Sequence, residues 1–376
     1  MVDDGRPAGP GRRGVLGAGV SGIAALGGLL GVPASAAAAA APGDARPAAA
    51  AVPRTRARRF QGAGEFRPGF AAGTLAVRWT EGTPRVRMVA ADGSRGPWRA
   101  VRGGCATGIG DGGHTGHAGP AGAEASSAFV DAGGAAAVEV DAAAGTQVVA
   151  LESTATAVTA LAAGVAVAGR RYLSRRAWGA DESLRFDAAG NERWVPAYFP
   201  VQTLTVHHTA TPYDDPDPAA RMRAIYRYQA VEQDYGDFGY NLVIDERGDL
   251  YEGRWSGTDT LPGFAPDGQM VTAAHVGGYN SGNFGIALLG DFTDRPPTPA
   301  AYGTLVLVLA VLTLWHQLDP LARTTYVNPV SAVTADVPTI VGHRDWPFAT
   351  QCPGNSFYPM LARLREDVAA LRNGPA

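Results

Sequence analysis

After Gly169 the sequence alternates short strand-like segments with longer helical ones, and this alternation restricts the fold more than any other feature of the chain. The segment 201–207 alternates in side-chain type, which predicts a strand with apolar side chains on one face and with threonines and a histidine on the other. Segments 285–289 and 339–343 predict two further strands. Strands separated by helices are typical of an α/β domain.

Helix and turn signals support the same fold class. Asp217-Pro218 is a strong helix start, because it places an N-cap residue before a proline at the first helical position. Thr298-Pro299 opens a long, mostly apolar helix, and the chain ends in an amphipathic helix. Segments 240–245 and 249–253 predict a hairpin around a Glu-Arg-Gly turn. We therefore expect residues 169–376 to form a mixed sheet flanked by helices.

The preceding region, residues 58–168, consists of short strand-like segments such as 75–79 and 85–89, separated by turns that contain Gly and Pro. Segments 136–140 and 146–151 look like a closing pair of strands. These patterns predict a small all-β domain, a sandwich, which a glycine-rich insert interrupts. We expect the following domain, residues 169–376, to fold without this β domain.

The N-terminus has the pattern of an export signal. Arg12-Arg13 precede an apolar stretch, 15–32, and small residues at its end resemble a cleavage site. Residues 1–36 are therefore interpreted as a signal peptide, and the paired arginines favour the twin-arginine route. A membrane anchor is the alternative. Residues 37–57, rich in Ala, Pro and Arg, predict a flexible linker, and the mature protein is expected to be secreted or held at the cell wall without stable membrane insertion.

Charge restricts the partners and the chemistry. The formal net charge is −3, and all 32 basic residues are arginine. No basic stripe is present, which argues against nucleic acid as a partner. Without lysine in the chain, no lysine acts as acid, base or nucleophile. We expect a monomer.

Three residues have the chemistry of a metal site. His207 ends the strand 201–207, His343 ends the strand 339–343, and Cys352 follows in the next loop. A catalytic zinc needs about three protein ligands of N, S or O type, and these hold their geometry best on rigid elements. The spacing alone is not a strong metal signature, because paired histidines are often part of hydrogen-bonded structure.

Nine short motifs follow one another along residues 170–370. They are Arg175-Arg176-Ala177-Trp178-Gly179-Ala180, Val206-His207-His208-Thr209-Ala210, Gly239-Tyr240-Asn241-Leu242-Val243-Ile244, Tyr251-Glu252-Gly253-Arg254, Ala274-His275, Gly278-Tyr279-Asn280, Gly285-Ile286-Ala287-Leu288-Leu289-Gly290-Asp291-Phe292, Gly342-His343-Arg344-Asp345 and Cys352-Pro353-Gly354. In this order they resemble the peptidoglycan recognition proteins and type 2 N-acetylmuramoyl-L-alanine amidases. The β-rich region before them resembles the accessory domain of exported bacterial members.

The resemblance implies an enzyme that hydrolyses the amide between N-acetylmuramic acid and L-alanine in peptidoglycan. It implies a zinc ion held by His207, His343 and Cys352, and catalytic roles for Tyr240 and Thr350. The chemistry agrees, since zinc lowers the pKa of its bound water toward about 7 and polarises a carbonyl. A phenol aimed at the carbonyl oxygen would stabilise the oxyanion that forms.

Three further residues are candidates for contact with the muropeptide. His275 matches a groove-lining histidine of the family, and His208 and Arg344 adjoin the implied ligands. Each has a structural alternative: His275 as a surface loop residue, His208 packed on the face opposite His207, and Arg344 orienting its loop. Tyr240 likewise is an ordinary strand residue if the resemblance is set aside.

The second cysteine leaves other possibilities open. Cys105 with His114 and His117 would be a second metal site, and Cys105 with Cys352 would be a disulfide. A lone thiol is the third interpretation, and we favour it because Cys352 stands in the family's ligand motif.

The alternative function is a non-catalytic peptidoglycan-binding protein, because many relatives only bind. Cys352 favours the enzyme, since non-catalytic relatives often lack this ligand. A wall-anchored adhesin is a third possibility. The sequence departs from the family in having one residue more between His343 and Cys352, which affects the assignment of Thr350. The segment after Arg254 is also longer, so peptide specificity does not transfer.

Overall fold

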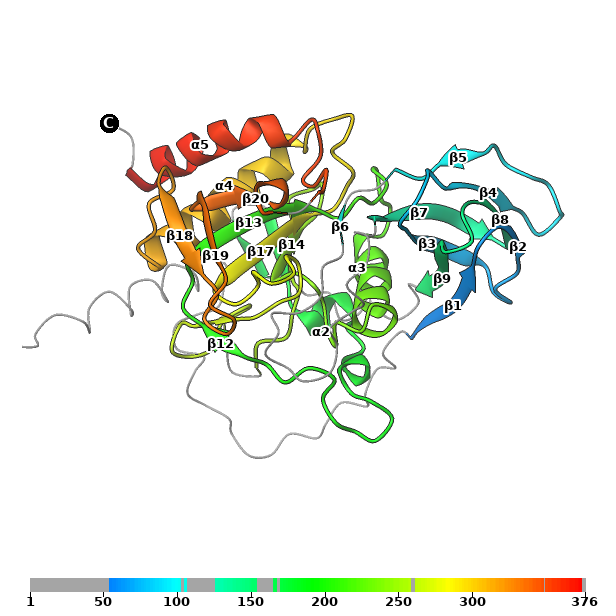
Figure 1. The fold of residues 1–376 in the computed structure, drawn as a ribbon, viewed down its shortest axis with the longest axis horizontal. Helices are drawn as coiled ribbons and strands as arrows, with labels where there is room; N and C mark the ends of the chain where they lie inside the picture. The colour runs from blue at the N-terminus through cyan, green and yellow to red at the C-terminus, as the bar shows by residue number, and fades with distance from the viewer. Residues whose placement is uncertain are drawn as a thin grey trace, which may run out of the picture.

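The computed structural model describes residues 54–102, 105–106, 126–153, 165–167, 170–257, 261–347 and 349–373. The predicted signal peptide, most of the predicted linker, and His114 and His117 of the glycine-rich insert lie outside these residues. The described chain forms two parts, a β sandwich and a mixed sheet with helices on both faces (Figure 1).

Two antiparallel sheets form the sandwich, as the sequence predicts. Leu75 and Val148 of one sheet and Val86 and Val138 of the other are buried in the core between them. The five-stranded sheet has the order β1 (Thr55–Gln61), β9 (Gln147–Ser153), β3 (Ala72–Trp79), β7 (Ser126–Ala135) and β6 (Cys105–Ala106). The four-stranded sheet has the order β2 (Gly64–Phe66), β8 (Ala137–Asp141), β4 (Arg85–Val89) and β5 (Arg99–Ala100).

One predicted strand pair is wrong. The sequence pattern makes 136–140 and 146–151 neighbours, but β8 pairs with β2 and β4, whereas β9 pairs with β1 and β3. β8 and β9 lie in different sheets, each with a neighbouring strand on either side. The chain that connects them therefore crosses from one sheet to the other. The sandwich also includes the end of the predicted linker 37–57, since β1 begins at Thr55.

The second part is built on a seven-stranded mixed sheet. Strand β13 is parallel to both β17 and β20, and β14 and β15 form the predicted antiparallel hairpin. β10 pairs with β11, so the sheet begins a few residues before the change in composition at Gly169. The strand order is β10 (Val165–Val167), β11 (Arg170–Leu173), β15 (Leu250–Glu252), β14 (Leu242–Ile244), β17 (Asn283–Leu288), β13 (Thr203–His208) and β20 (Ile340–Gly342).

Helices cover both faces of this sheet. Both predicted helix starts are confirmed, since the side chains of Asp217 and Thr298 accept hydrogen bonds from backbone N–H groups in the first turn of their helices. One face is covered by α3 (Pro218–Arg227), and the other by α4 (Pro299–Trp315) and α5 (Leu361–Asn373). Among the described residues, no helix combines the length and the apolar character needed to cross a membrane.

Short elements complete the chain. They are α2 (Arg175–Trp178), β12 (Tyr198–Phe199), β16 (Met270–Val271), β18 (Arg323–Val327), β19 (Thr334–Pro338) and the helical turns η2 (Glu182–Arg185), η3 (Tyr228–Glu232), η4 (His343–Asp345) and η5 (Tyr358–Met360). Strands β12 and β16 pair with each other, as do β18 and β19.

The sandwich packs against α3, which lies between the two parts (Figure 1). Ala224 and Tyr228 form an apolar cluster with Ala76, Val149 and Leu151 of the five-stranded sheet. This sheet therefore buries both of its faces, one in the sandwich core and one against α3. A second domain cut off near Gly169 would expose this cluster, and the expectation that the domain folds alone stays a prediction.

A buried arginine adds polar contacts to the same interface. Arg221 of α3 donates a 2.6 Å hydrogen bond to the hydroxyl of Thr74 in β3, and its Nε donates to Asp215 at 2.7 Å. Nearby, the exposed Arg59 pairs with Glu232 at 2.7 Å. Because Arg221 is buried, its hydrogen bonds contribute more than those of an exposed arginine.

Replacing Arg221 in the full chain tests the interface. Arg221→Ala removes a charged donor and leaves the buried hydroxyl of Thr74 without it, so we expect the free energy of unfolding to fall by about 1.5–3 kcal/mol. Urea denaturation measures this change. Arg67→Ala is the control, because Arg67 pairs with Glu65 at the surface, and it should have little effect. Equal effects of the two substitutions would contradict a stabilising interface.

Candidate metal centre

Two histidines lie side by side because their strands are parallel neighbours. Val206 of β13 is aligned with Gly342 of β20, so the residues that follow, His207 and His343, stand at the same end of the sheet. Their ring centroids are 4.6 Å apart, and both side chains are buried. The alternation of β13 directs Val206 into the core under α4 and α5, and His207 to the opposite face.

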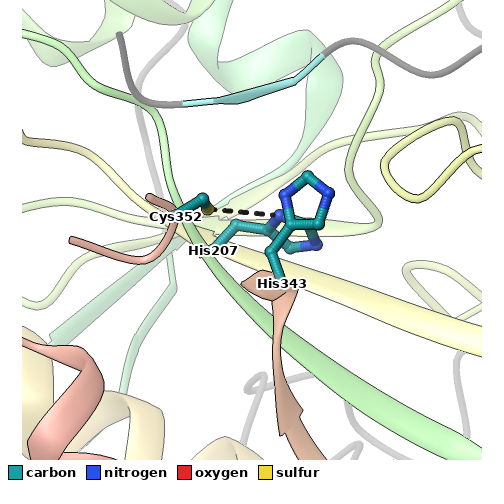
Figure 2. A group of neighbouring side chains, drawn as sticks. All are labelled: His207, His343 and Cys352. Carbon is teal, nitrogen blue, oxygen red and sulfur yellow. Dashed lines mark hydrogen bonds between the residues drawn. The ribbon is translucent and has the colours of Figure 1, made fainter. Parts of the chain in front are cut away.

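The loop after η4 brings a cysteine to the histidines. The backbone N–H of Arg344 donates to the carbonyl of Cys352 at 3.0 Å, which folds the loop back onto the strand end. The buried Sγ of Cys352 then lies 3.6 Å from Nδ1 of His207 and receives the backbone N–H of His208 at 3.4 Å. Figure 2 shows the three side chains converging. One ligand atom from each of His207, His343 and Cys352 lies within 4.8 Å of the others.

The geometry of this cluster fits a small transition-metal cation. Nδ1 of His343 is buried and has no hydrogen-bond partner among the described residues, as expected for a nitrogen that binds a metal. Nitrogen and sulfur ligands at about 2.1 and 2.3 Å from a tetrahedral zinc lie roughly 3.6 Å apart, which matches the distance between His207 and Cys352. Cys352 is present as a thiol. Two imidazoles and one thiolate are a donor set that zinc binds well.

A tyrosine ring packs beside the cluster. The ring centroid of Tyr240, just before β14, lies 5.2 Å from that of His207. Tyr240 shares a core cluster with Phe238, whereas Leu242 and Ile244 belong to the core on the other side of the sheet. Tyr240 therefore faces the cluster, and its carbonyl oxygen accepts the backbone N–H of Arg254 at 2.8 Å.

Comparison with known proteins identifies this part of the chain. Residues 197–355 match the family model described as N-acetylmuramoyl-L-alanine amidase. These residues form a domain of that family. The chain is 31% identical over 181 residues to the human N-acetylmuramoyl-L-alanine amidase, a match that covers 47% of this chain and 26% of the human protein. It is 30% identical over 128 residues to peptidoglycan-recognition protein 1 of Holotrichia diomphalia, covering 34% of this chain and 54% of that protein.

Solved structures resemble about half of the chain. Peptidoglycan recognition protein SD of Drosophila aligns with 24% identity and a TM-score of 0.37, covering 51% of this chain and 93% of that one. The chain spans about a quarter of the length of the human amidase, so the match concerns the amidase domain and not the whole of that relative.

In the amidase domain, His275 lies beneath the cluster and not at its surface. Its Nδ1 is 3.0 Å from Nε2 of His207, and its Nε2 is 3.0 Å from the carbonyl oxygen of Asn283. The side chain is only 7% exposed. Burial, and then the neighbouring His207, lower the pKa of His275 well below its usual range, which keeps the ring neutral. The predicted contact with substrate has no support in this geometry, because both ring nitrogens are used inside the protein.

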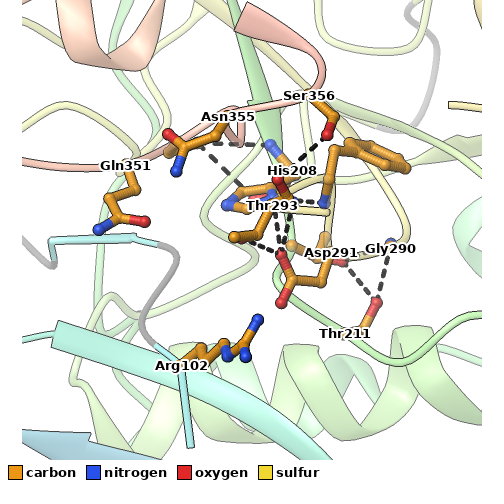
Figure 3. A network of polar contacts seen from close by, with 12 residues as sticks. Arg102, His208, Thr211, Gly290, Asp291, Thr293, Gln351, Asn355 and Ser356 are labelled. Atoms are coloured by element: carbon orange, nitrogen blue, oxygen red, sulfur yellow. Dashed lines mark hydrogen bonds and ion pairs between the residues drawn. The ribbon is translucent and has the colours of Figure 1, made fainter. Parts of the chain in front are cut away.

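His208 is also turned away from the surface. Its side chain is fully buried, and its Nδ1 accepts the backbone N–H of Phe292 at 3.2 Å, beside Asp291 (Figure 3). This placement agrees with the alternative in which His208 packs on the face opposite His207. It does not support contact with substrate, since the side chain is not exposed. Its backbone N–H, by contrast, contacts the cluster directly, because it donates to the sulfur of Cys352 at 3.4 Å.

Arg344 and Thr350 hold the cysteine loop. The guanidinium of Arg344 donates to the carbonyl of Gln351 and, at 3.0 Å, to the side chain of Asn355. The hydroxyl oxygen of Thr350 accepts the backbone N–H of Cys352 at 3.1 Å. These contacts give both residues a role in positioning Cys352. The roles of Arg344 in substrate binding and of Thr350 in catalysis stay predictions.

Sequence reasoning missed the glycines that let these side chains approach. A Cβ at Gly253 would clash with the backbone carbonyl oxygens of Tyr240 and Asn241. A Cβ at Gly285, inside β17, would come within 2.5 Å of the ring of His275. Glycine inside a strand marks a close approach of this kind, so Gly285 carried a usable signal, but the sequence does not show which side chain approaches.

Substitution of Gly253 tests how firmly Tyr240 is held. In Gly253→Ala, backbone atoms on both sides have to move, and we expect the free energy of unfolding to fall by about 1–3 kcal/mol. Urea denaturation measures the change. Gly145→Ala is the matched control, because a Cβ at Gly145 meets nothing within 4 Å and the backbone there is not left-handed. If both substitutions were equally mild, the close packing between Gly253 and Tyr240 would not constrain the site.

Proposed function

We propose that the chain is a zinc-dependent N-acetylmuramoyl-L-alanine amidase that acts on bacterial peptidoglycan. The observation that carries the proposal is the buried cluster of His207, His343 and Cys352 with the ring of Tyr240 beside it. The match of residues 197–355 to the amidase family supports the reaction type. A protein that only binds peptidoglycan needs a groove, but it has no need for three converging ligands.

The reaction is hydrolysis of the amide between the lactyl group of N-acetylmuramic acid and L-alanine. Water adds its oxygen to the carbonyl carbon, the carbon–nitrogen bond breaks, and the released amine of alanine takes up a proton. Zinc bound at the cluster would activate this water and polarise the carbonyl. The free carboxyl group then stays on the glycan, and the peptide leaves with L-alanine at its N-terminus.

The protein's own residues prepare the site for this chemistry. The backbone N–H of His208 donates a hydrogen bond to the sulfur of Cys352 and so helps to hold the sulfur at the cluster. The ring of Tyr240 lies 5.2 Å from that of His207, and in this proposal its phenol donates a hydrogen bond to the carbonyl oxygen as negative charge develops there. Thr350 and Arg344 keep the cysteine loop in place during the reaction.

We further propose that the enzyme is exported and meets peptidoglycan outside the cytoplasmic membrane. The support is the signal-like pattern of residues 1–36 in the sequence. Its target is then the polymer or its soluble muropeptides.

Metal content and reaction products test the proposal together. The purified protein should carry about one zinc per chain and release peptides that begin with L-alanine from polymeric peptidoglycan, while the glycan strands stay intact. Cys352→Ala should abolish both zinc binding and release. Cys105→Ala, at the other cysteine, should keep both. Elemental analysis and mass spectrometry of the products provide the two measurements.

Three outcomes would contradict this proposal. Full zinc content in Cys352→Ala would remove the cysteine from the ligand set. New reducing sugar ends would indicate a glycosidase. A zinc-loaded protein that retains cell-wall material but frees no peptide would be a binding protein.

The catalytic role of Tyr240 has its own test. Tyr240→Phe keeps the ring and removes only the hydroxyl, so turnover should fall by about 10²–10³ while zinc content is unchanged. Tyr302→Phe is the control, because Tyr302 lies on α4 and bonds to Asp367 on the other side of the sheet. Steady-state kinetics on a soluble muropeptide gives the rates. An unchanged rate in Tyr240→Phe would make Tyr240 a packing residue.

A further inference from the structure

A hydrogen-bonded chain runs from the metal cluster into the protein. Nε2 of His207 lies 3.0 Å from Nδ1 of His275, and Nε2 of His275 lies 3.0 Å from the carbonyl oxygen of Asn283. A carbonyl oxygen only accepts, so Nε2 of His275 carries the hydrogen. In the neutral ring Nδ1 of His275 is then an acceptor, and Nε2 of His207 has to be the donor.

This direction determines which nitrogen of His207 is available to a metal. A neutral histidine with hydrogen on Nε2 has its lone pair on Nδ1. Nδ1 of His207 is the nitrogen that faces Cys352, at 3.6 Å from its sulfur. The carbonyl of Asn283 therefore sets the tautomer of His207 through the ring of His275.

The ring of His275 is held firmly enough to do this. The side chain of Asn280 accepts the backbone N–H of His275 at 2.8 Å. Asn283 begins β17, where it is aligned with Thr203 of β13, so its carbonyl belongs to the same rigid sheet as His207. Gly285 of β17 provides the space for the ring, because a Cβ there would come within 2.5–2.7 Å of three ring atoms of His275.

We propose that His275 is a positioning residue that holds His207 in the tautomer with its lone pair on Nδ1, the nitrogen that faces Cys352, and that Gly285 is glycine to make room for the ring of His275. This inference rests on the proposed zinc site. It replaces the role of a substrate-contacting residue, since a nearly buried ring with both nitrogens bonded has no group left for a ligand. Partners of this kind typically change metal affinity by about 10- to 100-fold.

The first test measures zinc affinity by competition with a chelator. His275→Leu removes the acceptor and should weaken zinc binding about 10- to 100-fold. His275→Asn retains an oxygen near the position of Nδ1 and should weaken it less. Gly285→Ala leaves the histidine in place but displaces its ring, so it should weaken binding in the same direction. Gly145→Ala is the control and should bind like the unchanged protein.

The second test uses the metal-free protein and ¹⁵N NMR of the histidine rings. His207 should be protonated on Nε2 in the unchanged protein and should lose this preference in His275→Leu, while near-ultraviolet circular dichroism confirms that the variant is folded. Zinc affinity unchanged in both His275→Leu and Gly285→Ala, or a His207 ring protonated on Nδ1, would overturn the inference. If the unchanged protein binds no zinc, the proposed function fails, but the tautomer measurement still decides the role of His275.

Discussion

The parallel pairing of β13 with β17 and β20 is the constraint on which the rest of the site depends. Parallel neighbours end at the same edge of a sheet, so His207, near the end of β13, and His343, directly after β20, lie close together there. β20 delivers His343, β13 delivers His207, and β17 carries the carbonyl of Asn283 that anchors His275. Of the three ligands, Cys352 alone comes from a loop. The backbone N–H of Arg344 binds that loop to the strand end, and the hydroxyl of Thr350 accepts the N–H of Cys352 within the loop.

Because the cluster is buried, each of its polar atoms needs a partner. A polar atom buried without a partner costs about 1–3 kcal/mol, so each such atom in a core needs an explanation. Around this cluster the outward nitrogen of His207, both nitrogens of His275 and the sulfur of Cys352 have partners in the protein. Nδ1 of His207 and Sγ of Cys352 face each other at 3.6 Å, and Nδ1 of His343 has no partner among the described residues. A bound cation would satisfy these atoms together, which is why the same residues that destabilise an empty core suit a metal site.

Local signals in the sequence predicted much of this arrangement. The alternation along 201–207 placed His207 on the face opposite the apolar core, and the Asp-Pro and Thr-Pro pairs marked where α3 and α4 begin. What the sequence did not show depends on contacts between distant segments. The separation of β8 and β9 into different sheets is one example, since a short connection looks the same whether it turns back or crosses over. His275 is another, because its partners are defined by β13 and β17 and not by its own neighbours in the chain.

The sandwich contacts the segments that lie next to His207. Ala210, three residues after His207, has a left-handed backbone with φ of 51°, a conformation that costs an alanine roughly 1–2 kcal/mol. Its carbonyl oxygen accepts the backbone N–H of Phe129 from β7 at 3.2 Å, and the ring of Phe129 packs edge-on against Tyr228 after α3. The five-stranded sheet thus contacts both the strained turn that follows the first ligand and the helix that covers that face of the amidase sheet. The sandwich therefore packs against the elements next to His207, and it is more than an appended domain.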